Sequence, residues 1–248
     1  MDIGEPIAIA IAKELTEECP FDHSDGPHDK TNNLRNDASA LGASLGSGGE
    51  NFEVTIRPPG KDMKLPAGVA AHHLIPGNES LAKASKLLKL MKKGKEVKGD
   101  VGYDVNNKKN GVWLPGNYQW PTERFGAWSR VVATYDIGAF AQVAYAYACM
   151  DAKQCQFHDR HTDYSRWVKM TLEKIRLEVV RLQNECEKCD TSKKPYNPPY
   201  ELVDILNNLS QRIKPKLQGR PKSWRMPFFT SRFALLYHLG HKPESFLP

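Results

Sequence analysis

The sequence predicts an α+β fold in which helix outweighs strand. Three short segments have strand patterns, namely residues 51–56, 68–75 and 112–114. Longer segments repeat apolar residues every three or four positions, as amphipathic helices do. A few short strands among several helices in one chain are typical of an α+β domain.

The composition indicates a protein with a real core and an anionic partner. The chain has 248 residues, of which 40% are hydrophobic and 26% charged, enough to bury a large single core. No apolar run approaches the roughly 18 residues that span a bilayer. The opening MDIGEPIAIAIAKEL carries acidic residues where a secretory signal would carry basic ones. A net charge of +6 and a pI near 9.0 favour nucleic acid as the first choice of partner.

Residues 1–50 are predicted to be a loosely organised lead-in. Residues 20–36 are rich in Asp, His, Asn and Gly, and residues 41–49 read LGASLGSGG, the composition of a flexible linker. His23 and His28 are interpreted as solvated loop residues. We therefore expect the main domain to cover residues 51–248.

Two adjacent histidines, His72 and His73, lie late in the second predicted strand. That strand ends at the turn signal PGN of residues 76–78, as the first ends at PPG of residues 58–60. Neighbouring side chains of a strand point to opposite faces, so one ring can bind a metal while the other meets water or substrate. A His pair that only packs or is solvated is the alternative.

Residues 79–93 then change to helical periodicity. One predicted stripe is apolar and the other carries lysines, including Lys83, Lys86 and Lys93. The apolar positions are Leu81, Ala84, Leu88 and Met91. The lysine face suits a phosphate backbone, and a solvated face is the alternative.

An Asn-Gly turn precedes the third strand. Asn110 and Gly111 form a strong turn dipeptide, and Val112 to Leu114 are apolar. The Asn110 amide can donate to a backbone carbonyl and accept from a backbone N–H, which would brace the loop. A simple turn without this brace is the alternative.

Two histidines precede the longest predicted helix. Residues 123–150 predict a mostly buried helix, and a second helix runs from Tyr164 to Cys186 on an apolar stripe. Steps of three residues back from Tyr164 reach His161 and His158. If helical geometry extends that far, both rings lie on the buried side and suit a metal, whereas capping or surface residues are the alternative.

The five cysteines leave several interpretations open. Cys186 and Cys189 form a Cys-x-x-Cys pair at the end of the long helix. A zinc site with Cys149 and Cys155, disulfides, or ordinary packing all fit the sequence. Beyond them, helices are predicted over residues 201–216 and 232–239, with a short strand at 224–230.

Together the strand histidines, the Asn-Gly turn and the helix-start histidine compose a ββα metal site. The runs AHHLIP (71–76), NGVWLP (110–115) and HTDY (161–164) resemble the AHH nucleases of the His-Me finger (HNH, endonuclease VII) superfamily. The resemblance covers about residues 68–180. It implies a ββα-metal nuclease core embedded in a mainly helical domain, with the helices of residues 200–248 wrapped around it.

By that resemblance, His72 and His161 are metal ligands, His73 is the general base and Asn110 braces the loop. His158 would be a third ligand, although it lies three residues from His161 where some relatives have four. The metal is one divalent ion, with Mg²⁺ first and Zn²⁺, Mn²⁺ or Ni²⁺ as alternatives. The substrate phosphates would be bound by basic side chains drawn from Arg160, Arg166, Lys83, Lys86 and Lys93.

The resemblance also implies a biological setting. The chain would be a metal-dependent endonuclease of DNA, with RNA as second choice, and a secreted antibacterial toxin or effector. It would leave the producer's cytoplasm by a non-classical route, through secretion machinery or an adaptor, and act in the cytoplasm of a target cell. A cognate immunity protein would be its partner. The alternative is a non-enzymatic, zinc-stabilised nucleic-acid-binding module.

Overall fold

The computed structural model describes residues 19–58, 62–117 and 138–247. The chain divides into two compact units, each built from three separate segments. The helical unit comprises the described residues of 1–44, 73–111 and 162–214. The sheet unit comprises the described residues of 45–72, 112–161 and 215–248.

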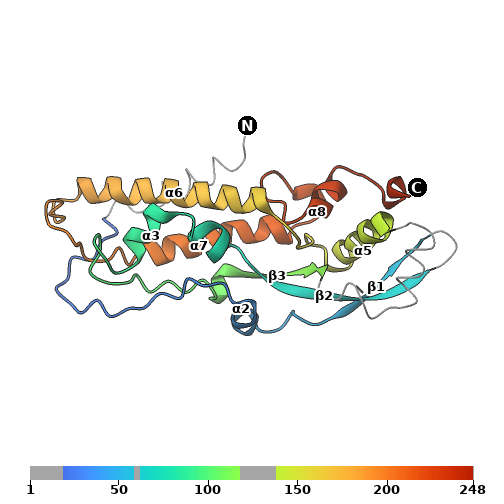
Figure 1. The fold of residues 1–248 in the computed structure, drawn as a ribbon, viewed down its shortest axis with the longest axis horizontal. Helices are drawn as coiled ribbons and strands as arrows, with labels where there is room; N and C mark the ends of the chain where they lie inside the picture. The colour runs from blue at the N-terminus through green and yellow to red at the C-terminus, as the bar shows by residue number, and fades with distance from the viewer. Residues whose placement is uncertain (1–18, 59–61, 118–137, 248) are drawn as a thin grey trace. The chain divides into compact units, whose positions relative to one another are not determined.

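Three strands form the sheet, in the order β1-β2-β3 (Figure 1). They are β1 (Phe52–Ile56), β2 (Met63–His73) and β3 (Gly111–Gly116), which confirms the predicted strands at residues 51–56, 68–75 and 112–114. β1 and β2 are antiparallel, with Phe52 opposite Ala67 and Ile56 opposite Met63. This pairing explains why β2 begins five residues before the predicted start at Gly68. The two histidines are the last residues of β2.

The core of the sheet unit lies between β1 and its helices. α5 (Gly138–Lys153) contacts β1, α8 (Arg232–His238) and the 3-10 turn η5 (Pro243–Phe246). Large buried side chains fill this core: Phe140, Tyr145, Phe157, Trp224 and Phe233. Residues 118–137 lie outside the described residues, so the predicted helix at 123–150 is seen only from Gly138.

The predicted strand at residues 224–230 is wrong. These residues form turns, with the Phe228 N–H donating to the Arg225 carbonyl at 2.9 Å. Trp224 and Phe228 are buried, so their apolar character reflects burial in the core and not pairing in a sheet. The predicted helix at 232–239 is confirmed by α8.

The helical unit is organised around α6 (Thr162–Glu185), the predicted long helix. Its apolar stripe is buried as expected, at Tyr164, Val168, Leu172, Ile175, Val179 and Leu182. Cys186 follows the helix and is half-buried. α7 (Leu202–Gln218) confirms the predicted helix at 201–216, and it belongs to the helical unit up to Lys214.

The single helix predicted at 79–93 is wrong, because two shorter elements occupy this segment. They are the π-helical turn η1 (Gly77–Leu81) and α3 (Ser85–Met91), which both contact α6. The Ser80 hydroxyl donates to the carbonyl of Ser165 at 2.8 Å and fastens η1 to α6. Because the helix is interrupted before Ser85, α3 faces the core with a different side from the one that the pattern predicted. Leu87 and Leu90 are buried, whereas the pattern predicted that Leu88 would be.

The segment expected to be a flexible linker contains ordered structure. α2 (Ala38–Leu45) begins at Asp37, whose carboxylate accepts from the backbone N–H of Ser39 and Ala40 at 2.9 Å each. A Cβ atom on Gly49 would lie 2.7 Å from the Trp113 ring. Glycine therefore serves close packing here. None of the helices in the described part of the chain is long and apolar enough to cross a membrane.

Candidate metal and catalytic site

Three histidines of the sheet unit converge at the end of β2. The ring centroids of His72 and His158 are 4.9 Å apart, those of His72 and His161 are 5.0 Å apart, and those of His158 and His161 are 5.3 Å apart. Each ring offers one nitrogen, and these three nitrogens lie within 4.8 Å of one another. His72 is buried, whereas His158 and His161 are half-buried. The cluster is therefore reachable from solvent on one side.

The backbone places His158 by pairing it with the end of β3. Its N–H donates to the carbonyl of Pro115 at 2.7 Å, and it forms a bridge with Gly116. The preceding Phe157 is fully buried in the core of the sheet unit. The sequence predicted that helical spacing would align His158 with His161. Instead α6 begins at Thr162, and strand-like pairing determines where His158 lies.

Three imidazoles around one point are a suitable set of metal ligands. Neutral histidine nitrogens bind Zn²⁺, Mn²⁺ and Ni²⁺, whereas Mg²⁺ prefers oxygen ligands. Three protein ligands also leave positions open for water or a substrate oxygen, as catalytic metal sites do. The donor set therefore fits a catalytic divalent ion of the transition series.

His73 is held in one tautomer by Asn106. The Asn106 side chain donates through Nδ2 to the carbonyl of Arg35 at 3.0 Å, and its Oδ1 accepts from the Asp37 N–H at 2.9 Å. These two bonds fix which side of the amide is oxygen. His73 Nε2 lies 2.8 Å from that oxygen, so Nε2 must carry the proton. In the neutral ring, Nδ1 therefore keeps its lone pair.

Burial keeps the His73 ring neutral. The side chain is only 7% exposed, and desolvation lowers its pKa below the ordinary value for histidine. The hydrogen bond to Asn106 and the carboxylates of Asp37 and Asp104 act in the opposite direction, but burial outweighs them. A neutral ring with a lone pair on Nδ1 can accept a proton.

Asn110 joins three backbone segments of the helical unit. Its Oδ1 accepts from the Ile75 N–H at 2.7 Å, and its Nδ2 donates to the carbonyls of Ile75 at 3.1 Å and Val105 at 2.7 Å. The Ser210 hydroxyl of α7 also donates to Oδ1, at 2.9 Å. Asn110 is fully buried, so its amide fixes the chain just after the histidine pair.

Two further side chains, Asn106 and Tyr164, support the histidine pair and were not singled out by the sequence. The Tyr164 hydroxyl donates to the carbonyl of Leu74 at 2.5 Å. The sequence showed Tyr164 only as part of an apolar stripe, and Asn106 as one polar residue among several. Their partners lie 90 and 33 positions away in the chain, and no local pattern connects residues over such distances.

Residues 58–209 match the family model described as "a nuclease family of the HNH/ENDO VII superfamily with conserved AHH". The match covers more than half of the chain and contains the triplet Ala71, His72 and His73. The chain belongs to the AHH nuclease family. It matches none of the curated proteins and none of the solved structures with which it was compared.

The basic residues expected to bind substrate lie at the surface of this AHH nuclease. Arg160, Arg166, Lys83, Lys86 and Lys93 are all exposed. Lys83 pairs with Glu79 at 2.6 Å, and Arg166 pairs with Asp163 at 3.1 Å. Exposed ion pairs of this kind contribute at most about 1 kcal/mol, so a phosphate can displace the carboxylates.

Lys93 lines a basic hollow of the helical unit. The cavity has a volume of about 350 Å³ and lies over the end of α3. Its lining includes four lysines and one carboxylate: Lys89, Lys92, Lys93, Lys95 and Glu96. The excess of positive charge there suits an anionic chain.

The cysteines of the AHH nuclease do not group as the sequence suggested. Cys149 and Cys155 are buried thiols whose pKa values burial raises to about 12. Cys186 and Cys189 instead meet Cys19 and His23, and this set of four is a second group with ligand spacing. Among the described cysteines none forms a disulfide.

Proposed function

We propose that this AHH nuclease is a metal-dependent endonuclease that hydrolyses phosphodiester bonds of DNA, with RNA as the second substrate. The observation that carries the proposal is a cluster of three histidines, one of which, His72, is followed in the chain by a histidine, His73, that is held as a proton acceptor. Metal-assisted hydrolysis requires a ligand set with open positions and a neutral imidazole as base.

His72, His158 and His161 are the proposed metal ligands. A bound divalent ion would neutralise the negative charge that grows on the phosphate and on the leaving oxygen. The sequence favoured Mg²⁺, but three imidazole nitrogens suit Zn²⁺ or Ni²⁺ better than Mg²⁺ or Mn²⁺, which prefer oxygen ligands. The burial of His72 and the backbone pairing of His158 hold two of the rings in place before an ion binds.

His73 is the proposed general base. Because Nε2 donates to Asn106, Nδ1 is the atom that would take the proton from the attacking water. Asn106 and Asn110 act through other groups: Asn106 holds the ring, and Asn110 holds the backbone that follows it. Both are therefore positioning residues.

Arg160 is the first choice for a phosphate contact. Its side chain is exposed, and in the chain it lies within two residues of two proposed ligands, His158 and His161. A guanidinium can bind a phosphate through two parallel hydrogen bonds. Arg166, Lys83, Lys86 and Lys93 would add weaker and salt-dependent contacts with the backbone.

The N-terminal segment contributes to the nuclease unit. Arg35 and Asp37 supply the two backbone groups that orient Asn106. We therefore propose that a working nuclease requires the chain from about residue 35, and not only the domain of residues 51–248 expected from composition.

The biological role proposed for the chain is that of a secreted antibacterial toxin or effector. The support is the family membership and the basic surface, since a toxin of this kind must find nucleic acid in a target cell. The proposal includes export by a non-classical route, through secretion machinery or an adaptor, and action in the cytoplasm of the target cell. It also includes an immunity protein that protects the producer.

The second candidate is a zinc-stabilised module that binds nucleic acid without cleaving it. The group formed by Cys19, His23, Cys186 and Cys189 favours it. Such a module would shift DNA in a gel but leave plasmid intact under every metal condition.

One plasmid assay separates the two candidates. The purified chain, stripped of metal, is incubated with supercoiled plasmid and with Mn²⁺, Zn²⁺, Ni²⁺ or Mg²⁺ in turn. We expect nicked and linear products with at least one ion and none with chelator. In the same assay His73→Ala should lose cleavage. His241→Ala, which changes an exposed histidine near the C-terminus, is its matched control and should keep cleavage. DNA binding without cleavage under all conditions would overturn the proposal.

A further inference from the structure

Four side chains of the helical unit meet at one point. Cys19 Sγ lies 3.4 Å from Cys189 Sγ, and Cys186 Sγ lies 3.4 Å from His23 Nε2. The four ligand atoms all lie within 4.8 Å of one another. Zn–S bonds of about 2.3 Å at tetrahedral angles separate two sulfurs by about 3.8 Å, whereas a disulfide separates them by about 2.05 Å. The observed spacing fits ligands around an ion better than an S–S bond.

The Cys-x-x-Cys pair forms a tight turn directly after α6. The Cys189 N–H donates to the Cys186 carbonyl at 3.1 Å. Backbone N–H groups of Lys188 and Cys189 also donate toward the Cys186 sulfur. Such donors stabilise a thiolate, the form of cysteine that binds metal.

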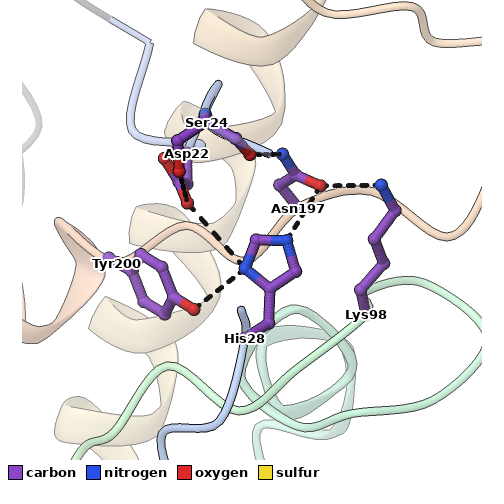
Figure 2. A network of polar contacts seen from close by, with 6 residues as sticks. All are labelled: Asp22, Ser24, His28, Lys98, Asn197 and Tyr200. Atoms are coloured by element: carbon purple, nitrogen blue, oxygen red, sulfur yellow. Dashed lines mark hydrogen bonds and ion pairs between the residues drawn. The ribbon is translucent and has the colours of Figure 1, made fainter. Parts of the chain in front are cut away.

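The other two ligands lie on an N-terminal segment that a polar network fastens in place. Figure 2 shows the ring of His28 between Tyr200 and Asn197, with distances of 3.1 Å from Nδ1 to the Tyr200 hydroxyl and 3.2 Å from Nε2 to Asn197 Oδ1. Asn197 Nδ2 donates to the Ser24 carbonyl at 2.9 Å, and Lys98 Nζ donates to Asn197 Oδ1 at 2.8 Å. Residues 22–28 are thereby held against the loop that carries Asn197.

Contacts made by the residues between Cys19 and His23 complete this attachment. Phe21 is 4% exposed and meets the ring of Tyr196 edge-on, with centroids 6.0 Å apart. The Asp22 N–H donates to the Pro198 carbonyl at 3.1 Å. Cys19 and His23 flank these two anchored residues. The protein therefore assembles the four ligands by contacts that do not require the ion.

The electrostatic surroundings suit the charge of such a site. Three thiolates carry one more negative charge than a divalent ion neutralises. Lys98, Lys188 and Lys193 line the same hollow, of about 180 Å³, as His23 and Cys189. Asp22 and Asp190 line it as well, so the three lysines leave one net positive charge, which can balance the excess negative charge of the site.

We propose that Cys19, His23, Cys186 and Cys189 bind a structural zinc ion. Three sulfurs and one imidazole complete a tetrahedral shell and leave no position for water, which separates this site from a catalytic one. The ion would join residues 163 to 170 positions apart. Because the four ligands come together only in the folded chain, the free energy of binding the ion would add to the stability of the fold. The proposal is independent of the nuclease activity.

Cobalt substitution in the full-length chain tests the site. Bound Co²⁺ should give a thiolate-to-metal charge-transfer band in the near ultraviolet and strong visible bands typical of tetrahedral cobalt. The charge-transfer band should correspond to one thiolate-bound ion per chain, apart from any Co²⁺ held by the three histidines. Cys189→Ser should abolish the charge-transfer band. Cys155→Ser changes a buried cysteine outside the cluster and should leave it intact. His72→Ala should also leave it intact, because an all-histidine site produces no such band.

A second measurement on the unmodified protein guards against a variant that fails to fold. The chain is purified in zinc without chelator, desalted, and treated with a thiol-specific mercurial in the presence of a coloured zinc indicator. We expect one equivalent of zinc to be released as the thiols react. No thiol-dependent zinc release, or a Cys19–Cys189 disulfide in the peptide map of the unreduced protein, would overturn the proposal.

Discussion

Replacing Asn106 by alanine should impair catalysis without impairing metal binding. Asn106 Oδ1 accepts a hydrogen bond from Nε2 of His73 at 2.8 Å. This bond keeps the proton on Nε2 and leaves Nδ1 as the nitrogen that can take a proton from water. A hydrogen bond of this kind contributes about 1 kcal/mol. Its loss also frees the ring to turn, so we expect kcat to fall by roughly tenfold to a hundredfold, the size typical of losing a partner that orients a functional histidine.

The same substitution should lower stability. It removes the partners of the Asp37 N–H and the Arg35 carbonyl, and an unsatisfied buried polar group costs about 1–3 kcal/mol. Asn32→Ala is the matched control. Asn32 also bridges backbone groups of the helical unit, accepting from Gly102 and Tyr103 and donating to Met91, but it touches no proposed catalytic group.

The assay combines single-turnover plasmid nicking at saturating metal with calorimetric titration of the same ion and a thermal melt. Asn106→Ala should show reduced kcat, metal affinity within about twofold of wild type, and a lower Tm. Asn32→Ala should lower Tm with little change in kcat. Equal losses of kcat in both variants, or an unchanged kcat in Asn106→Ala, would refute the positioning role.

Three more outcomes are expected. His73→Ala should lower kcat by roughly 10²- to 10⁴-fold with metal affinity retained, and nicking at the wild-type rate would show that His73 is not the base. His158→Ala should weaken metal binding, measured by calorimetry, by tenfold or more. Burial lowers the folded-state pKa of His73, so this ring binds a proton more readily in the unfolded chain than in the folded one. The stability that the neutral ring contributes is therefore present above about pH 6.5 and declines as the pH falls below that value. Thermal melts should show a smaller acid loss of Tm in His73→Gln than in wild type, and an identical loss would contradict this. Gly49→Ala places a Cβ 2.7 Å from the Trp113 ring and should cost about 1–3 kcal/mol in urea unfolding. Gly94→Ala, whose Cβ would meet the Lys92 carbonyl oxygen at an ordinary contact distance of 3.8 Å, should cost less than about 1 kcal/mol. Equal costs would show that the contact does not restrain Gly49.

The sequence by itself was sufficient for the elements that local pattern controls. Alternation and turn residues predicted the strand that carries His72 and the strand that follows Asn110, and a run of apolar residues in steps of three and four predicted α6. These signals are strong because the side-chain repeat of a strand or helix is a property of the backbone alone. Packing against α6 divides residues 77–91 into η1 and α3. There the local pattern predicted one continuous helix and predicted that Leu88, rather than Leu87 and Leu90, would be buried.

Only the tertiary structure decided which distant side chains meet. Asn106 reaches His73 across 33 positions, and Cys19 reaches Cys189 across 170. The sequence left a zinc site of Cys186 and Cys189 with Cys149 and Cys155, disulfides and ordinary packing all open, and it offered no reason to choose the N-terminal Cys19. Side chains far apart in the chain are brought together by the packing of whole elements, which depends on all of their contacts at once and leaves no periodic signal in the sequence.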